Sequence, residues 1–368
     1  MSQILMLAGD VNLQGRADPA TAFTHVLDLL TAADVRFVNL EGALCGAGDD
    51  PRAPDIAHKP NWRHSEPDMV TGLSAAGIDA VSVANNVTFP PSAMLRSLDT
   101  LDAAGIAHCG GGTDLDEAHR PVVLERDGTR FGLLAYTSIC WPFGMAAGQR
   151  TAGVATLRAS TSYVPDLRSA EVPGRPPRVL TEPYPHELAA MIRDVEELRA
   201  RCDVLVLSCH WGVAGDDVCD YQKAIGRAAV DAGADLVMGH GPHSLQGIEV
   251  YHGRPIFYSL GNFVFDWPVM AGRHLDGLVL HCRVDERRLR GVEVHPVRRG
   301  PDNDVRPLVG DEARSVLDRV AALSARFGSA PFDPATFDPA PFDPATFDRA
   351  ATTAEIPVTL PQAVYSPS

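Results

Sequence analysis

Side chains that could bind a cation or transfer a proton stand where apolar runs of this sequence end. Asp10 ends ILMLAGD, Glu41 follows VRFVNL, and Asn85 and Asn86 follow DAVSVA. His210 ends the run VLVLSCH. Three further residues have comparable positions: His240, His243 and Asn262. Carboxylates, amides and imidazoles are ligands that Mn, Fe, Zn and Mg accept, and two ions about 4 Å apart would need about this many.

Each of these residues also has a structural explanation when it is considered alone. A single histidine at the end of a strand is more often hydrogen-bonded within the protein than bound to a metal. Asp10 could cap the N-terminus of a helix, and Glu41 could be a surface residue before a glycine turn. The case for a site therefore depends on whether the fold brings these residues together.

The elements that must position these residues are strands that alternate with helices. Residues 18–34 predict a helical segment, and residues 35–42 predict the strand that follows it. Three segments carry a glycine typical of a helix C-cap: Gly77, Gly105 and Gly233. Continuous apolar strands between helices indicate a sheet covered on both faces, with ligands at the strand ends. Residues 246–300 predict antiparallel strands, so the expected class is α/β with a β-rich C-terminal half.

Two segments interrupt this pattern. Residues 145–186 are rich in Pro, Gly and Ser and lack periodicity, which indicates a long insertion that forms a lid or a wall of the substrate site. Residues 331–350 contain a near-perfect ten-residue repeat, PFDPATFDPA followed by PFDPATFDRA. Its prolines predict a flexible or polyproline-like tail. Alternatively, its phenylalanines cover the active site or a partner subunit of a homo-oligomer. We expect one domain over 1–315 and an extension over 316–368.

The composition argues against several classes of partner. The 368 residues carry a formal net charge of −15, which disfavours nucleic acid and anionic membrane surfaces. No run reaches the roughly 18 apolar residues of a membrane span, and MSQILMLAG is too short for a signal sequence. We therefore expect a cytoplasmic protein whose seven dispersed cysteines are reduced. Arg287, Arg288 and Arg290 are expected at a solvated hairpin edge.

The polar strand ends belong to motifs that resemble one known family. GDVNL, NLEG, ANN, HWG, GHGPH with Gln246 nearby, and YSLGNFVFD occur in the order and approximate spacing of the CapA-like proteins. These proteins are named for bacterial poly-γ-glutamate capsule synthesis and are part of the calcineurin-like metallophosphatase superfamily. The resemblance covers about residues 3–300. It implies a four-layer αββα sandwich of two mixed sheets flanked by helices, with a metal site at the carboxyl ends of the strands.

The resemblance also implies a set of metal ligands. Asp10 and His243 would hold one divalent ion, and Glu41 would occupy the place of the bridging carboxylate. Three residues would hold a second ion: Asn86, His210 and His240.

Three departures from the family pattern affect the expected chemistry. Asn12 stands where the superfamily usually has a histidine, and it would be a weaker ligand or none. Val87 replaces the histidine that serves the leaving group or the transition-state charge. The acidic residue expected a few positions later is also missing. Loss of a general acid typically costs about 10²–10⁴ in rate, so a changed reaction is the first hypothesis.

Under this hypothesis the chain is a repurposed enzyme that acts on a small organic biosynthetic intermediate. The reaction would be a dehydration, a cyclisation or an addition. It would use one or two ions of Mn, Fe, Zn or Mg, or metal-free acid–base catalysis. The catalytic candidates are Asp10, Glu41, His58, Lys59, His210 and His240. The substrate-binding candidates are Asn85, Val87, Trp211 and Asn262.

Two alternatives remain open. One is divalent-metal-dependent phosphoester hydrolysis, because phosphoryl transfer depends mainly on positioning and charge stabilisation. His58, Lys59 or His64 would then replace the missing histidine. The other alternative is a non-catalytic or poly-γ-glutamate-related binding protein. The acidic composition argues against this role, because an acidic surface repels a polyanion.

Overall fold

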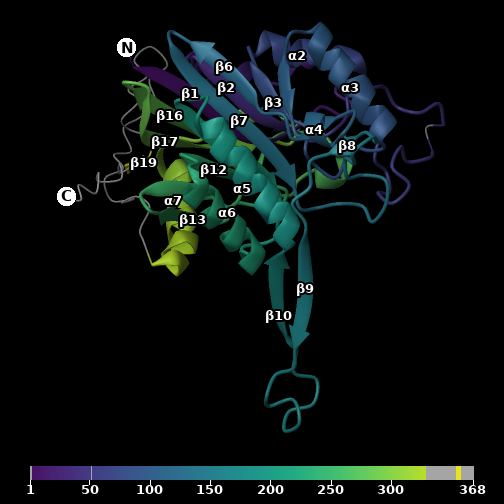
Figure 1. The fold of residues 1–368 in the computed structure, drawn as a ribbon. Coiled ribbons are helices and arrows are strands. Elements are labelled where there is room, and N and C mark those ends of the chain that lie inside the picture. The colour runs from purple at the N-terminus through teal and green to yellow at the C-terminus, as the bar shows by residue number, and fades with distance from the viewer. Residues whose placement is uncertain (1, 51, 329–353, 358–368) are drawn as a thin grey trace.

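Two mixed β-sheets lie face to face, and helices cover their outer faces (Figure 1). The computed structural model describes residues 2–50, 52–328 and 354–357. Within this part of the chain, one sheet has nine strands in the order β18-β17-β16-β1-β2-β3-β4, with β15 beside β1 and β19 beside β17. Its strands are β1 (Gln3–Asn12), β2 (Val35–Leu40), β3 (Ala80–Ser82), β4 (Ala107–Cys109), β15 (Asn262–Phe265), β16 (Asp276–Asp285), β17 (Arg288–Arg299), β18 (Val305–Pro307) and β19 (Ala354–Pro357).

The second sheet has six strands among the described residues, in the order β13-β14-β12-β11-β7-β6. They are β6 (Val122–Arg126), β7 (Thr129–Thr137), β11 (Val204–His210), β12 (Leu236–His240), β13 (Ile248–Tyr251) and β14 (Arg254–Phe257). The pairs β7–β11, β11–β12 and β12–β14 are parallel. Every residue of β11 is buried, which explains its nearly continuous apolar sequence.

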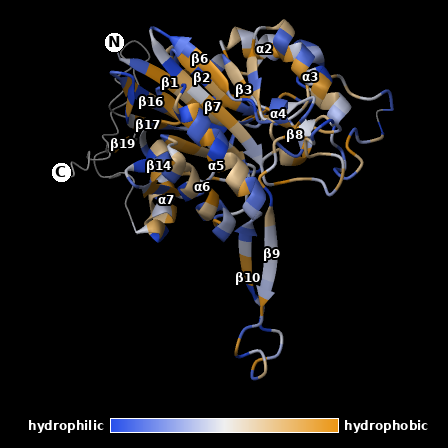
Figure 2. Ribbon diagram, viewed as in Figure 1, coloured by the Kyte–Doolittle hydropathy of each residue, from blue (hydrophilic) through white to orange (hydrophobic). Residues whose placement is uncertain are grey.

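Helices pack on the outer face of each sheet. The nine-stranded sheet is covered by α1 (Leu27–Thr31), α2 (Val70–Ala75) and α3 (Pro91–Ala103). The six-stranded sheet is covered by α5 (Pro185–Arg199) and α6 (Asp220–Ala232), with the short α4 (Leu115–Ala118) nearby. Figure 2 shows hydrophobic and hydrophilic positions mixed along α5 and α6, as expected for helices with one buried face.

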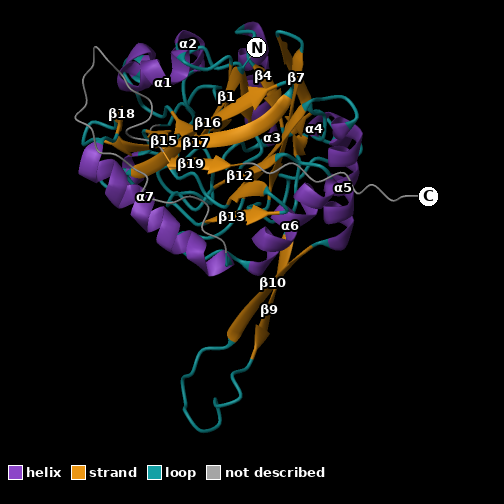
Figure 3. Ribbon diagram, turned by 90° about the vertical axis from the view of Figure 1, so that its left-hand side faces the viewer, coloured by secondary structure: helices purple, strands orange, loops and turns teal. Residues whose placement is uncertain are grey.

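The apolar core forms three layers, one between the sheets and one under the helices on each side. Leu7 and Phe37 of the nine-stranded sheet meet Leu133 and Val206 of the six-stranded sheet in the middle layer. Helix α7 (Gly310–Ser324) packs its buried side against this layer (Figure 3). The predicted αββα sandwich of two mixed sheets is therefore confirmed. Antiparallel pairing among β13, β14, β16 and β17 also confirms the β-rich C-terminal half.

Two expectations about individual segments need correction. Residues 18–34 form separate short pieces, η1 (Pro19–Thr21), η2 (Thr24–Val26) and α1, instead of one helix. The boundary expected after residue 315 falls inside α7, whose residues Leu317 and Val320 belong to the core. The proline-rich repeat at 331–350 lies outside the described residues. None of the described helices is long and apolar enough to cross a membrane.

The segment 145–186 contains regular structure that its sequence did not indicate. Strand β8 (Gly153–Val154) pairs with β5 (Gly111–Gly112) close to the body of the molecule. Strands β9 (Ala159–Val164) and β10 (Arg178–Pro183) then form a two-stranded hairpin that projects away from the sandwich in both views (Figures 1 and 3). Trp141, four residues before this segment, lies beside the candidate site described below.

Candidate metal centre

The nine-stranded sheet places Asp10 at the middle of the site. Asp10 is aligned with Asn39 on β2 and with Asn262 on β15, so three strands meet around its carboxylate. Gly9 makes this close approach possible, because a Cβ atom there would lie 2.0 Å from the carbonyl oxygen of Gly261. Asn39 Nδ2 donates a 2.7 Å hydrogen bond to Asp10 Oδ1 and fixes its orientation.

The six-stranded sheet contributes the histidines. His210 and His240 are the last residues of β11 and β12, and they are direct partners in the parallel ladder between these strands. The ladder therefore sets the two imidazoles side by side, with their Nδ1 atoms 3.0 Å apart. Ser208 Oγ lies 2.7 Å from His240 Nε2 and holds the second ring from behind.

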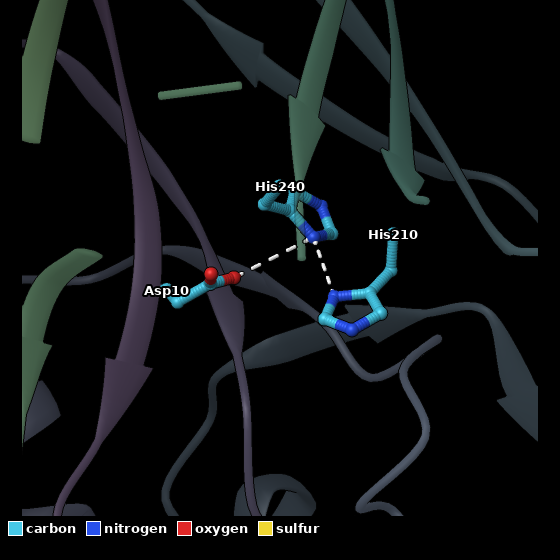
Figure 4. Close-up of side chains that lie close together, drawn as sticks. All are labelled: Asp10, His210 and His240. Atoms are coloured by element: carbon cyan, nitrogen blue, oxygen red, sulfur yellow. Dashed lines mark hydrogen bonds and ion pairs between the residues drawn. The ribbon is translucent and has the colours of Figure 1, made fainter. Parts of the chain in front are cut away.

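Two groups of potential ligands meet at Asp10. His240 Nδ1 lies 3.6 Å from Asp10 Oδ1, and with His210 these residues form the first group (Figure 4). His243 Nδ1 lies 3.7 Å from Asp10 Oδ2, and His243 Nε2 lies 3.8 Å from Glu41 Oε1, which forms the second group. Asp10 is common to both groups, with one oxygen facing each. This geometry gives Asp10 the shared position that the family resemblance implied for Glu41.

The electrostatics of the centre disfavour charge on its residues. Burial raises the pKa of Asp10 well above its ordinary value, and the nearby Glu41 adds to the rise. Burial also raises the pKa of Glu41 to about 7, against the opposing charge of Lys59. The pKa of His240 falls to about 3 because its imidazole is buried and lies near His243. A bound cation would stabilise the ionised form of these carboxyl groups, and it would coordinate imidazoles in their neutral form.

The donor set fits one or two divalent ions. Glu41 is fully buried, and neither of its carboxylate oxygens has a hydrogen-bond partner among the described residues. A buried carboxylate without partners is costly unless a cation or a proton satisfies it. Asp10, His240 and His210 are also buried, and imidazole and carboxylate together suit Mn, Fe or Zn.

The two adjacent asparagines have different roles in this geometry. Asn85 is fully buried, and its Oδ1 accepts hydrogen bonds from Val87 N, Thr88 N and Thr88 Oγ1 at 2.9–3.3 Å. Its Nδ2 donates to the carbonyl oxygen of Leu40 at 2.8 Å. Asn85 therefore ties β3 to the end of β2, and its amide is already used within the protein, which differs from the substrate-binding role expected for it.

Asn86 faces the centre. Its Oδ1 lies 3.0 Å from His210 Nε2 and can only accept a hydrogen bond, so this contact requires the proton of His210 on Nε2. The Nδ1 lone pair of His210 then faces His240. In this arrangement Asn86 orients the imidazole of His210, whereas the resemblance implied that Asn86 is a direct ligand. The carbonyl oxygen of Asn86 accepts a 2.6 Å hydrogen bond from Trp141 Nε1.

Val87 lies in an apolar cluster next to the centre. It is fully buried and packs with Ile56, Trp62, Phe265 and Trp267. The ring of Phe265 in turn contacts the ring of His243, with 5.1 Å between their centroids. Val87 therefore presents an apolar side chain to this side of the centre and has no proton to donate.

Lys59 brings a positive charge to the same cluster. Its Nζ lies 3.9 Å from Glu41 Oε1 and 4.3 and 4.6 Å from the ring centroids of Trp62 and Trp267. Burial lowers the pKa of Lys59, although the carboxylate of Glu41 opposes the shift. The adjacent His58 is exposed and faces Trp141, with 5.7 Å between the ring centroids. Lys59 thus reaches the centre, and His58 lies at its outer side.

Of the remaining predicted residues, Asn262 contacts a potential ligand and Trp211 is part of the core. Asn262 Oδ1 lies 2.9 Å from His243 Nδ1, so Asn262 orients a potential ligand. Trp211 is fully buried in the core of the six-stranded sheet, and its Nε1 donates to the carbonyl oxygen of Tyr258 at 2.8 Å. This core position gives no support to the expectation that Trp211 binds substrate. None of the interactions described for His64 involves the centre; its backbone N–H donates to Asp55.

Sequence reasoning missed three residues that support the centre. These residues are Asn39, Ser208 and Trp141, none of which was among the predicted site residues. Asn39 and Ser208 could have been found from strand register, because Asn39 is aligned with Asp10 and Ser208 precedes His210 by two positions on the same face. Trp141 carries no such signal, because it reaches the centre from an irregular segment.

The fold and the centre define an αββα sandwich protein with a candidate divalent-metal site at the carboxyl ends of its strands. Residues 4–267 match the family described as bacterial capsule synthesis protein PGA_cap, and the chain belongs to this family. The resemblance to CapA-like proteins is thereby confirmed.

Curated relatives match over about two thirds of the chain. An uncharacterized protein, y4sH of Sinorhizobium fredii, is 30% identical over 283 residues, covering 66% of this chain and 61% of its own length. The PGA biosynthesis protein CapA of Bacillus subtilis is 33% identical over 248 residues, covering 66% of this chain and 56% of its own length. The chain thus spans little more than half of these relatives. A phosphatase from Mycoplasma pneumoniae has a similar structure at a TM-score of 0.41 and 12% identity, covering 81% of this chain and 87% of its own.

Proposed function

We propose that the chain is a divalent-metal-dependent enzyme that acts on a small organic substrate. The observation that carries the proposal is the buried carboxylate of Glu41, which has no hydrogen-bond partner among the described residues and lies 3.8 Å from His243. Glu41 and His243 form a ligand group with Asp10, and Asp10 also belongs to the second group. Buried carboxylates with a purely structural role are paired with hydrogen-bond donors of the protein. In a cation site their oxygens are free to bind the ion. A bound ion would supply Lewis acidity and would lower the pKa of a coordinated water.

The residues around the centre favour reactions in which the leaving group does not need to be protonated. Val87 offers no proton where the superfamily usually has a histidine, and the cluster around it excludes water. Lys59 is a hydrogen-bond donor that can bind an oxyanion or carboxylate of a substrate beside Glu41. Asn86 and Asn262 hold the rings of His210 and His243 in place. Dehydration, cyclisation or addition of a small carboxylated molecule fits these roles.

Hydrolysis of phosphoesters with good leaving groups is the second candidate. The two ligand groups around Asp10 support it, because phosphoryl transfer needs mainly charge stabilisation and positioning. Without a general acid, the rate would depend strongly on the pKa of the leaving group. Aryl phosphates would therefore be cleaved, whereas alkyl phosphates would be nearly inert.

The test compares metal-loaded wild-type protein with the Glu41→Gln variant. Both proteins are given Mn²⁺ or Zn²⁺ and assayed with aryl and alkyl phosphates and with a panel of small carboxylated molecules, with and without poly-γ-glutamate. Metal-dependent turnover that Glu41→Gln reduces at least 100-fold supports the proposal. Glu249→Gln is the matched control, because Glu249 is a buried carboxylate on β13 that pairs with Arg227 and belongs to neither ligand group. Turnover that does not depend on metal, or that both variants reduce equally, would contradict the proposal.

A further inference from the structure

A cavity of about 490 Å³ lies at the other end of the strands that carry the centre. Asp203 immediately precedes β11 and Asp235 immediately precedes β12, whereas His210 and His240 end these strands. Both aspartates line the cavity, together with four arginines: Arg199, Arg254, Arg287 and Arg288. The cavity and the centre are therefore separate places, joined by the length of two buried strands.

Each aspartate at the cavity is held by two guanidinium groups. Asp203 accepts hydrogen bonds from Arg287 at 2.7 Å and from Arg130 at 3.3 Å. Asp235 pairs with Arg199 at 2.6 Å and with Arg254 at 3.3 Å. One guanidinium would neutralise one carboxylate, so the second one in each case adds a positive charge. This excess stands out in a chain whose formal net charge is −15.

Two of the cavity arginines have unused hydrogen-bonding capacity. The Nη1 atom of Arg254 is buried and has no partner among the described residues, although its Nη2 atom pairs with Asp235. The guanidinium of Arg288 is exposed, and no ion pair or side-chain hydrogen bond links it to another described residue. A guanidinium carries five N–H donors in a planar fork that matches carboxylate and phosphate oxygens.

The turn between β16 and β17 points to a role for its side chains. Asp285 pairs with Arg288, so Glu286 and Arg287 alone connect the two strands. Both have positive φ angles, 49° and 63°. Asn-Gly or Asp-Gly is favoured at such a two-residue turn, and other residues cost about 1 kcal/mol or more in this conformation. The sequence thus places Arg287 beside the cavity despite an unfavourable backbone conformation at this residue.

We propose that this cavity binds a small molecule that carries carboxylate or phosphate groups. The volume is within the range of about 300–1,000 Å³ that is typical of small-molecule sites. Cys202, which also lines the cavity, does not oppose an anion, because burial raises the pKa of its thiol to about 11 and keeps it neutral at pH 7. Glu286 also lines the cavity, but it pairs with Arg290 at 2.7 Å.

A purely structural role explains only part of this arrangement. Arg287 joins the β16–β17 turn to Asp203, and Arg199 joins α5 to Asp235, so these pairs connect the two sheets and a helix. Neither connection needs Arg288, which is exposed and touches no described carboxylate. Substitution of Arg288 should therefore weaken ligand binding without removing a contact that supports the fold.

The test is isothermal titration of the full-length protein with two probes, tricarballylate and inorganic pyrophosphate, at low ionic strength. Binding of one probe molecule per chain is expected, and Arg288→Gln should weaken it about tenfold. Preference for tricarballylate would identify a carboxylated ligand, and preference for pyrophosphate a phosphorylated one. Arg306→Gln, on β18 and outside the cavity, is the matched control and should bind like the wild type.

The same titration separates this site from the metal centre. Glu41→Gln should leave binding at the cavity unchanged even if it abolishes metal binding, so the proposal does not depend on the proposed function. The inference is wrong if the wild type binds neither probe, or if Arg306→Gln weakens binding as much as Arg288→Gln. It is also wrong if Glu41→Gln abolishes binding while Arg288→Gln does not, because the probe would then occupy the metal centre.

Discussion

Asp10 and Glu41 are two buried carboxyl groups that the protein itself barely neutralises. Asn39 donates one hydrogen bond to Asp10, and Lys59 lies 3.9 Å from Glu41. Burial raises the pKa of both carboxyl groups, so the metal-free centre keeps protons that a cation would displace. This is the electrostatic reason why we interpret the cluster as a cation site.

Replacement of Val87 by histidine tests whether a proton donor at this position can serve a leaving group. We expect Val87→His to raise the rate for alkyl phosphates relative to aryl phosphates by about 10²-fold, because it introduces a proton donor. The variant should also lose about 1–3 kcal/mol of unfolding free energy, because Val87 is fully buried in an aromatic cluster. The measurements are the ratio of the two rates and a denaturant titration.

Val87→Leu is the control for the change in size. It should show a loss of stability without the change in rate ratio. If both variants keep the wild-type ratio, the side chain at position 87 does not face the leaving group, and the argument from the missing histidine fails.

Lys59 should weaken metal binding while it assists the reaction. Its ammonium group is close enough to repel a cation held by Glu41, since two unit charges about 4 Å apart interact by several kcal/mol at intermediate dielectric. We expect Lys59→Met to bind Mn²⁺ about tenfold more tightly and to turn over substrate more slowly. Competition with a fluorescent chelator measures the affinity. Lys59→Arg keeps the charge and should keep the affinity; weaker binding by Lys59→Met would show that Lys59 supports the ligands instead.

At the scale of elements, the centre depends on where parallel strands end. His210 and His240 are neighbours because β11 and β12 end at the same level, and Asp10 faces them across the two sheets. Strand register therefore does most of the positioning, and side-chain hydrogen bonds that involve Asn86, Asn39 and Ser208 complete it.

The Asp203 contacts at the start of β11 should make stability depend on pH. Burial alone would raise the pKa of Asp203, but hydrogen bonds from Arg130 and Arg287 outweigh it and lower the pKa to about 2. A carboxyl group with a lowered pKa stabilises the fold above its unfolded pKa of about 3.9, and this contribution is lost as the pH falls towards 2. We expect Asp203→Asn to lose about 2 kcal/mol at pH 7 and much less near pH 2.5.

Unfolding free energies of wild type and Asp203→Asn at the two pH values test this expectation. Asp116→Asn, at an exposed position of α4, is the control and should match the wild type at both. An equal loss for Asp203→Asn at pH 7 and pH 2.5 would mean that the charge of Asp203 is not what holds the turn.

The order of elements and most of the centre were predictable because they follow local rules. Apolar runs that end in Asp10, His210 and His240 predicted strands with polar ends, and parallel strands collect such ends at one edge. The roles of individual polar side chains were less predictable. Asn85 and Asn86 are adjacent in sequence, yet one closes a loop and the other holds His210, because they point in different directions after β3.

Other features required three-dimensional information. Trp211 follows His210 directly, but its indole turns into the core, where Tyr258 accepts its N–H. Arg287 and Arg288 lie, as predicted, at an exposed hairpin edge, but the sequence did not indicate that this turn meets the ends of the second sheet at the arginine-rich cavity. Such contacts join segments more than 80 residues apart, and no local pattern encodes them.

On the scale of the whole molecule, charge is distributed unevenly. The chain has a formal net charge of −15, yet four arginines gather at the cavity below β11 and β12, and Lys59 lies inside the centre at the opposite strand ends. Anionic small molecules are therefore expected at two places on an otherwise acidic protein. The hairpin of β9 and β10 projects away from the sandwich and presents Tyr163 and Leu167 to solvent.

The most direct test of the central claim is the metal content of purified, tag-free protein, measured by plasma mass spectrometry after incubation with Mn²⁺ and removal of free ions. We expect one to two equivalents per chain in the wild type, fewer in Glu41→Gln and close to none in Asp10→Asn, because Asp10 is shared by both ligand groups. Glu249→Gln should retain the wild-type content. A wild-type protein with near-zero metal, or an Asp10→Asn variant that binds as much as the wild type, would contradict the account.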